Sequence, residues 1–134
     1  MKKKTGSAVS ISLQPRFRIL CGKKIAFGPG KADLLELIAE TGSIGKAASR
    51  MDMSYMRAWS LIQTMNACFN EPVIEALRGG CRRGGAELTK TGQHVLKLYR
   101  QMEKAGLKAA QADWRALQKP MRKRSRLLPR GKSG

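Results

Sequence analysis

The sequence predicts an α+β domain that is mainly α-helical, with a short β-hairpin and a long C-terminal helix. The 134 residues suffice for one core, and 42% of them are hydrophobic, which is enough for a compact interior. Apolar residues recur at helical spacing in several segments, and a β-like stretch with a glycine-rich centre interrupts them. We expect a basic, flexible N-terminus at 1–15, a folded domain at 16–114 and a disordered basic tail at 115–134.

The folded domain is predicted to begin with one or two short strands. In residues 16–27 apolar and polar side chains alternate, and a turn at Gly22 divides the segment. A helix follows at about 31–40, because its leucine and isoleucine residues recur at helical spacing. Gly42 can adopt the left-handed conformation that ends such a helix.

Two further helices are predicted, with a short turn between them. Ser43 would cap a helix at 44–51 and Ser54 a longer one at 55–70, since a serine oxygen accepts hydrogen bonds from free helix N–H groups. Asp52 and the residue after it would form the turn. The longer helix would place one stripe toward the core, consisting of Ala58, Trp59, Ile62, Met65, Asn66 and Phe69.

The other side of this longer helix carries no acidic residue. At about 100° per residue it presents polar and small side chains, namely Met56, Arg57, Ser60, Gln63, Thr64 and Ala67. A short helix, a tight turn and a second helix with such a side are typical of a helix-turn-helix unit. Periodicity alone is equally compatible with a face that contacts only solvent. The neighbouring hairpin and the positive charge of the chain favour a face that contacts DNA.

Residues 73–88 predict a β-hairpin with a long, flexible tip. Arg82 and Arg83 lie between two glycine pairs, so the loop could lie close to a sugar-phosphate backbone while the arginines donate to phosphate oxygens. Such a hairpin is the wing of a winged helix-turn-helix domain. The last helix would begin near Thr89 or Thr91 and continue to Trp114. Its inward side chains would be Val95, Leu98, Tyr99 and Met102.

The charge of the chain favours a polyanionic partner. Twenty-seven Lys and Arg residues against nine Asp and Glu give a net charge of +18, far more than solubility requires. Eight of the basic residues lie in 115–134, which would be either a phosphate-binding arm or a merely solubilising disordered end. Nucleic acid is therefore the first partner to test.

Other classes of function find little support in the sequence. His94 is the single histidine and the acids are scattered, so we expect no catalytic site, no cofactor and no metal site. Gly79 to Gly85 lacks the lysine and hydroxyl residue of a phosphate-binding loop. Three widely spaced cysteines, Cys21, Cys68 and Cys81, predict free thiols in a reducing cytoplasm. No apolar run is long enough for a membrane span, and we expect no membrane partner.

Several motifs resemble the N-terminal domain of ModE-type molybdate-responsive transcriptional regulators, a winged-helix family related to the LysR-type DNA-binding domain. They are Gly22-Lys23-Lys24-Ile25-Ala26-Phe27-Gly28-Pro29-Gly30, Glu40-Thr41-Gly42-Ser43-Ile44, Met53-Ser54-Tyr55-Met56-Arg57-Ala58-Trp59 and Asn66-x-x-Phe69-x-x-Pro72. The resemblance covers about residues 16–103. Full-length members carry C-terminal molybdate-binding domains, which we expect this chain to lack, and the residues offer no site for direct molybdate binding.

The resemblance implies a homodimer on a pseudo-palindromic operator in double-stranded DNA, with the helix that begins at Ser54 in the major groove. Arg57 and Ser60 would contact base edges, Ser54 and Tyr55 would contact phosphates or bases, and Gln63 and Thr64 would share that face. Met56 stands where members often have lysine, and it would either contact a thymine methyl or pack. Arg82 and Arg83 would hold the wing on the backbone.

The sequence thus predicts a sequence-specific transcriptional regulator of molybdate transport or molybdenum-related genes, without enzyme activity, acting on the nucleoid in the cytoplasm. Two alternatives remain open. Charge alone could make the chain a sequence-independent, architectural nucleic-acid-binding protein. The last helix could also dock the chain on a separate molybdate sensor.

Overall fold

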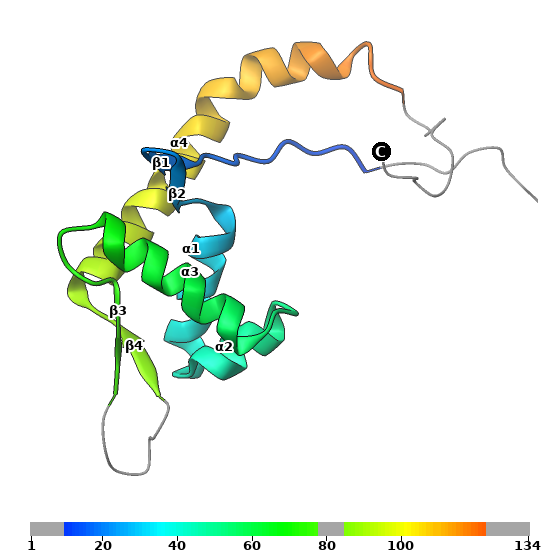
Figure 1. The fold of residues 1–134 in the computed structure, drawn as a ribbon. Helices are drawn as coiled ribbons and strands as arrows, with labels where there is room; N and C mark the ends of the chain where they lie inside the picture. Colours follow the sequence, from blue (N-terminus) through cyan, green and yellow to red (C-terminus); the bar gives the residue numbers. More distant parts are fainter. Residues whose placement is uncertain (1–9, 78–84, 123–134) are drawn as a thin grey trace, which may run out of the picture.

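The computed structural model describes residues 10–77 and 85–122, and Figure 1 shows their arrangement. In chain order the elements are β1 (Ile19–Cys21), β2 (Lys24–Phe27), α1 (Pro29–Thr41), α2 (Ile44–Arg50), α3 (Tyr55–Cys68), β3 (Ile74–Ala76), β4 (Ala86–Leu88) and α4 (Lys90–Gln118). The mainly helical α+β architecture predicted from the sequence is confirmed, including the hairpin before the long last helix.

One hydrophobic core lies between α1, α2, α3, the β3–β4 hairpin and the first half of α4. The buried side of α2 consists of Ile44, Ala47 and Ala48, and its two alanines let neighbouring elements approach closely. Phe27 brings β2 into this core. Its ring packs edge-on against Tyr99 of α4 and Phe69 after α3, with centroids 5.1 Å and 6.3 Å away.

The ends of the first three helices are fixed by the residues that the sequence singles out. Gly42 has φ 72°, and its N–H donates to the carbonyl of Ile38 as α1 ends. The Oγ atoms of Ser43 and Ser54 accept hydrogen bonds from the third residue of α2 and of α3. Between these helices Asp52 adopts φ 55°, which turns the chain sharply. The two helices therefore form the predicted helix-turn-helix unit.

The wing hairpin is attached to the junction between α1 and α2. Strands β3 and β4 pair antiparallel, with Ile74 opposite Leu88 and Ala76 opposite Ala86. Gly85 forms a β-bridge with Ser43, and the N–H of Ala86 donates to the carbonyl of Gly42 over 3.0 Å. These bonds place the base of the wing beside the start of α2.

The last helix is tied to the body along its first half. The Tyr99 hydroxyl donates a 2.6 Å hydrogen bond to the carbonyl of Phe17. The Arg100 guanidinium donates to three carboxylates, those of Asp33 and Glu36 on α1 and of Glu103 on α4. Beyond these contacts the second half of α4 projects away from the body (Figure 1).

Four details of the sequence prediction are wrong. Trp59, expected in the core, is 38% exposed, because it lies at the margin of the α3 stripe whose centre is Ala58, Ile62 and Met65. Leu98 and Met102 are exposed as well, since the body packs against the neighbouring side of α4 around Tyr99. Residues 115–118, expected in the disordered tail, continue α4 to Gln118. Strand β1 is exposed along its whole length instead of alternating.

Candidate nucleic-acid interface

The exposed side of α3 is the surface that the sequence predicts to contact DNA. Met56 is 72% exposed, and the structure also exposes Ser54, Tyr55, Arg57, Ser60 and Gln63. Thr64 is less exposed than these residues, because its side chain is half-buried. Its hydroxyl donates a hydrogen bond to the carbonyl of Ser60 over 3.1 Å. The remaining six residues are all exposed, extend from the N-cap to the middle of the helix and include no acid.

The start of α3 carries the positive end of a helix dipole without a compensating acid. Ser54 Oγ accepts from the N–H of Arg57 over 3.0 Å, which aligns the first turn and leaves the hydroxyl hydrogen available to a ligand. The first turns of α1 and α2 contain no acidic residue either. Such helix starts favour anions, including phosphate groups.

Several acidic residues are held in ion pairs away from this surface. Asp33 and Glu36 on α1 bind Arg100 of α4, with nitrogen–oxygen distances of 2.8 Å and 2.9 Å. Glu40 pairs with Arg50 at 2.9 Å. These three paired acids also line an open depression, together with Leu37, Ala39 and Met51. Negative charge is thus gathered around α1, whereas the outer side of α3 has none.

One flank of α3 lies beside the positive charge of Lys31. Burial lowers the pKa of Lys31 on α1. The charge of Cys68 raises this pKa, and the nearby positive charge of Arg57 lowers it. The Lys31 ammonium donates to the carbonyl of Ile25 over 2.7 Å, which holds it beside the β1–β2 hairpin. This flank therefore adds positive potential next to Arg57.

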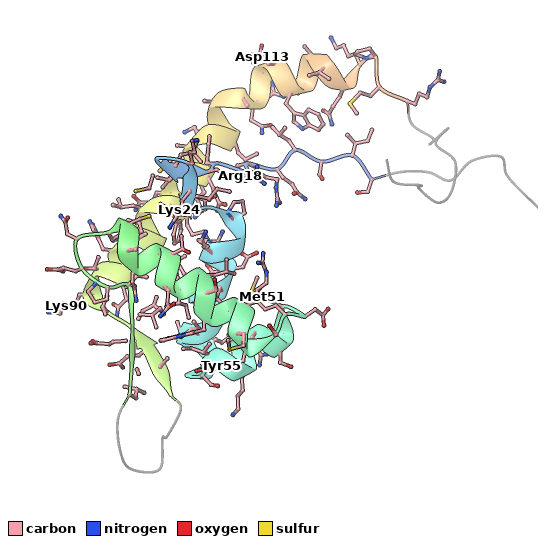
Figure 2. All side chains as sticks on the ribbon, in the orientation of Figure 1. Arg18, Lys24, Met51, Tyr55, Lys90 and Asp113 are labelled. Atoms are coloured by element: carbon pink, nitrogen blue, oxygen red, sulfur yellow. The ribbon has the colours of Figure 1, made fainter. Side chains whose placement is uncertain are left out.

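The other flank of α3 borders the start of α2 and the segment that leads into β3. Figure 2 shows Tyr55 at the start of α3 near α2. A Cβ added to Gly45 would lie 4.0 Å from Cδ1 of Tyr55. Further along the helix, Asn66 Oδ1 accepts a 2.7 Å hydrogen bond from the N–H of Val73, immediately before β3. Trp59 projects between Tyr55 and Asn66 on the same flank, since all three are separated by about whole turns. The sequence pattern missed this exposed indole because its spacing also fits the buried stripe.

Arg82 and Arg83, the predicted backbone contacts of the wing, lie outside the described residues. The base of the hairpin is described up to the hydrogen bond from the N–H of Leu77 to the carbonyl of Gly85, 2.9 Å long. The described base thus places the ends of the connecting segment beside the helix-turn-helix unit.

The described residues contain no group of three His, Cys, Asp or Glu side chains that could hold a metal ion. Cys21 and Cys68 are free thiols, and hydrogen bonding to Cys21 raises the pKa of Cys68; Cys81 lies outside the described residues. Among the helices in 10–77 and 85–122, none combines the length and hydropathy needed to cross a membrane.

Comparison with known proteins points to one group of regulators. The chain is 41% identical over 70 residues to the molybdenum transport protein ModE of Azotobacter vinelandii, which covers 52% of this chain and 26% of the relative. It is 38% identical over 77 residues to the DNA-binding transcriptional dual regulator ModE of Escherichia coli, covering 58% of this chain and 29% of the relative. The chain thus spans less than a third of the length of these relatives. No protein-family model matches it.

The fold matches a solved complex of the CbnR DNA-binding domain with DNA. The TM-score is 0.50 at 22% sequence identity, and the match covers 64% of this chain and 93% of the CbnR domain. At this identity the likeness concerns the fold alone. The described part of the chain thus has the winged helix-turn-helix fold, and over 70–77 residues the chain is similar in sequence to ModE.

Proposed function

We propose that this chain is a transcriptional regulator that binds double-stranded DNA sequence-specifically, with the exposed side of α3 in the major groove. The observation that carries the proposal is the exposed, acid-free side of the second helix of a helix-turn-helix unit, with a serine-capped start. The ModE relatives and the DNA complex of the similar CbnR domain support it. A net charge of +18 supplies the general attraction to phosphate.

Within this surface the side chains have different roles. Arg57 would donate two hydrogen bonds to a guanine, and Ser60 and Gln63 would contact neighbouring base edges. Ser54 and Tyr55 at the helix start would contact phosphates. Met56, exposed at 72%, would meet a thymine methyl group. Thr64 would act indirectly, because its hydroxyl is bound to the helix backbone.

We further propose that the chain works as a homodimer joined along α4. The helix presents an exposed stripe at alternating spacings of four and three residues, which is the pattern of a helix-helix seam. This α4 stripe consists of Leu98, Met102, Ala105, Ala109, Ala112 and Ala116. Its alanines would let a second copy approach closely, and two copies would bind two half-sites of an operator.

Substitution of the stripe tests the dimer. Ala109→Glu would place a charge in the seam and should yield monomers, measured by analytical ultracentrifugation. Lys104→Glu, a larger charge change at an exposed residue off the stripe, should leave dimers intact. Equal sedimentation of wild type and Ala109→Glu would contradict the proposed seam.

The name of the Azotobacter vinelandii relative suggests genes of molybdenum transport as targets. Genes of molybdate transport or molybdenum metabolism are therefore the proposed targets, and the nucleoid in the cytoplasm is the proposed place of action. Arg82, Arg83 and the basic residues after 118 would add backbone contacts. Direct binding of molybdate is not part of the proposal.

Selection of bound duplexes from a random pool tests sequence-specific binding. The proposal expects one enriched motif, arranged as an inverted repeat. Immunoprecipitation of bound genomic DNA, with and without molybdate in the medium, would then identify target genes. Recovery of unrelated sequences with equal affinity would instead favour the architectural alternative.

A further inference from the structure

We propose that Trp59 contacts the sugar-phosphate strand of bound DNA between α3 and the wing. The inference rests on the proposed function, because it assigns a role at the same surface. Trp59 would be a positioning contact that holds α3 at a fixed depth and angle in the groove. Nothing in the comparisons assigns this residue a role.

The first observation is the exposure of a large aromatic side chain on a polar surface. Trp59 is 38% exposed, whereas its neighbours Ala58 and Ile62 are fully buried. Two further exposed side chains, Tyr55 and Met56, lie one turn before it, at 53% and 72%. Trp59, Tyr55 and Met56 are thus neighbouring exposed apolar side chains, and contiguous exposed apolar patches are typical of binding surfaces.

The second observation is the direction of this flank. Tyr55, one turn before Trp59, lies beside Gly45, and that end of α2 adjoins the bridge between Ser43 and Gly85. Asn66, two turns after Trp59, is bonded to Val73 at the entrance to β3. The indole therefore lies on the flank of α3 that borders the two places where the wing is attached, the entrance to β3 at Val73 and the start of α2 beside Gly85.

The third observation is the division of charge along α3. Arg57 lies at the opposite edge of the exposed outer side, toward Lys31, and Ser60 and Gln63 lie on that side between Arg57 and Trp59. If that outer side meets base edges, the backbone of one strand must pass over the wing-side flank. The occupant of this flank is therefore a phosphodiester strand.

An indole suits such a strand in two ways. Its apolar face can pack on the C–H groups of a deoxyribose, and its Nε1–H can donate to a phosphate oxygen. Both contacts are independent of base identity. Loss of Trp59 should therefore weaken binding to all duplexes alike, in contrast to loss of Arg57.

Tryptophan fluorescence tests the proposal directly. The chain has two tryptophans, so a Trp114→Phe variant of the full chain retains Trp59 as its single tryptophan, which can be excited selectively over the tyrosines. We expect its emission to change, and its quenching by acrylamide to fall, over the same duplex concentrations at which the anisotropy of a labelled duplex rises. Unchanged emission and quenching during saturable duplex binding would overturn the proposal and leave the proposed function intact.

Affinities provide the second readout. Trp59→Ala should weaken binding by about tenfold to the selected duplex and to a scrambled one, with Trp59→Phe between the two because it keeps an apolar ring. Circular dichroism melts would check that both variants fold. Affinities of folded Trp59→Ala within about twofold of wild type would contradict the proposal, and so would a loss confined to the selected duplex. Absence of duplex binding by the wild type would overturn the proposed function as well.

Discussion

The side chain of Asn66, near the end of α3, accepts a 2.7 Å hydrogen bond from the backbone N–H of Val73, which leads into β3. Val73 is fully buried, so this amide depends on Asn66 for its partner. This bond ties the end of α3 to the entrance of the wing.

Removal of this acceptor should destabilise the domain. Asn66→Ala would leave a buried N–H without a partner, and we expect the free energy of unfolding to fall by about 1–3 kcal/mol. Urea denaturation followed by circular dichroism measures the change. Asn66→Asp keeps an oxygen at the same position and should recover most of the loss. If both variants were equally destabilised, the hydrogen bond would not be the cause.

Gly92 should tolerate no side chain. It lies in the first turn of α4, where a Cβ atom would fall on the carbonyl oxygen of Val73. The backbone itself cannot move aside without breaking the β3–β4 region, so Gly92→Ala should cost about 1–3 kcal/mol or more. Gly30→Ala is the matched control, because its Cβ would have no neighbour within 4 Å. It should change stability by less than about 1 kcal/mol. Similar melting temperatures for the two variants would contradict the close approach of α4.

Tyr99 should make stability depend on pH in the alkaline range. Burial raises the pKa of its phenol, and the negative charge of Glu103 raises it further. Above about pH 10 the unfolded chain releases this proton while the folded chain retains it, so stability falls as pH rises.

The comparison of Tyr99→Phe with wild type isolates this effect. At neutral pH the variant should be less stable by about 1 kcal/mol, because the hydrogen bond to Phe17 is lost. The deficit should stay constant up to about pH 9 and shrink above about pH 10. Tyr55→Phe, which removes an exposed phenol, should follow the wild-type dependence. A constant deficit for Tyr99→Phe across this range would show that the phenol does not contribute.

Much of the fold is predictable from the sequence because local signals fix it. Gly42, Ser43 and Ser54 determine helix ends through backbone conformation and hydrogen bonds that depend on near neighbours. The glycine-rich segment between two β-like runs identifies the wing. The exposed, acid-free side of α3 follows from the same helical spacing that defines its buried side.

The errors arise where burial depends on distant parts of the chain. The spacing of Trp59 fits the buried stripe of α3, yet its exposure depends on how near the wing and α2 approach. Leu98 and Met102 fit a stripe of α4 as well as Tyr99 does. The body selects the side with Tyr99, through Phe17 and Phe27. Periodicity identifies apolar sides of a helix, but the tertiary fold decides which of them it covers.

The central claim is that the outer side of α3 distinguishes DNA sequences. The measurement that tests it most directly is the affinity of wild type and Arg57→Ala for the selected duplex and for a scrambled duplex at the same salt concentration. We predict that the wild type prefers the selected duplex, and that Arg57→Ala loses about tenfold or more of this preference while its affinity for the scrambled duplex changes little. Equal weakening on both duplexes, or an unchanged preference, would contradict the claim.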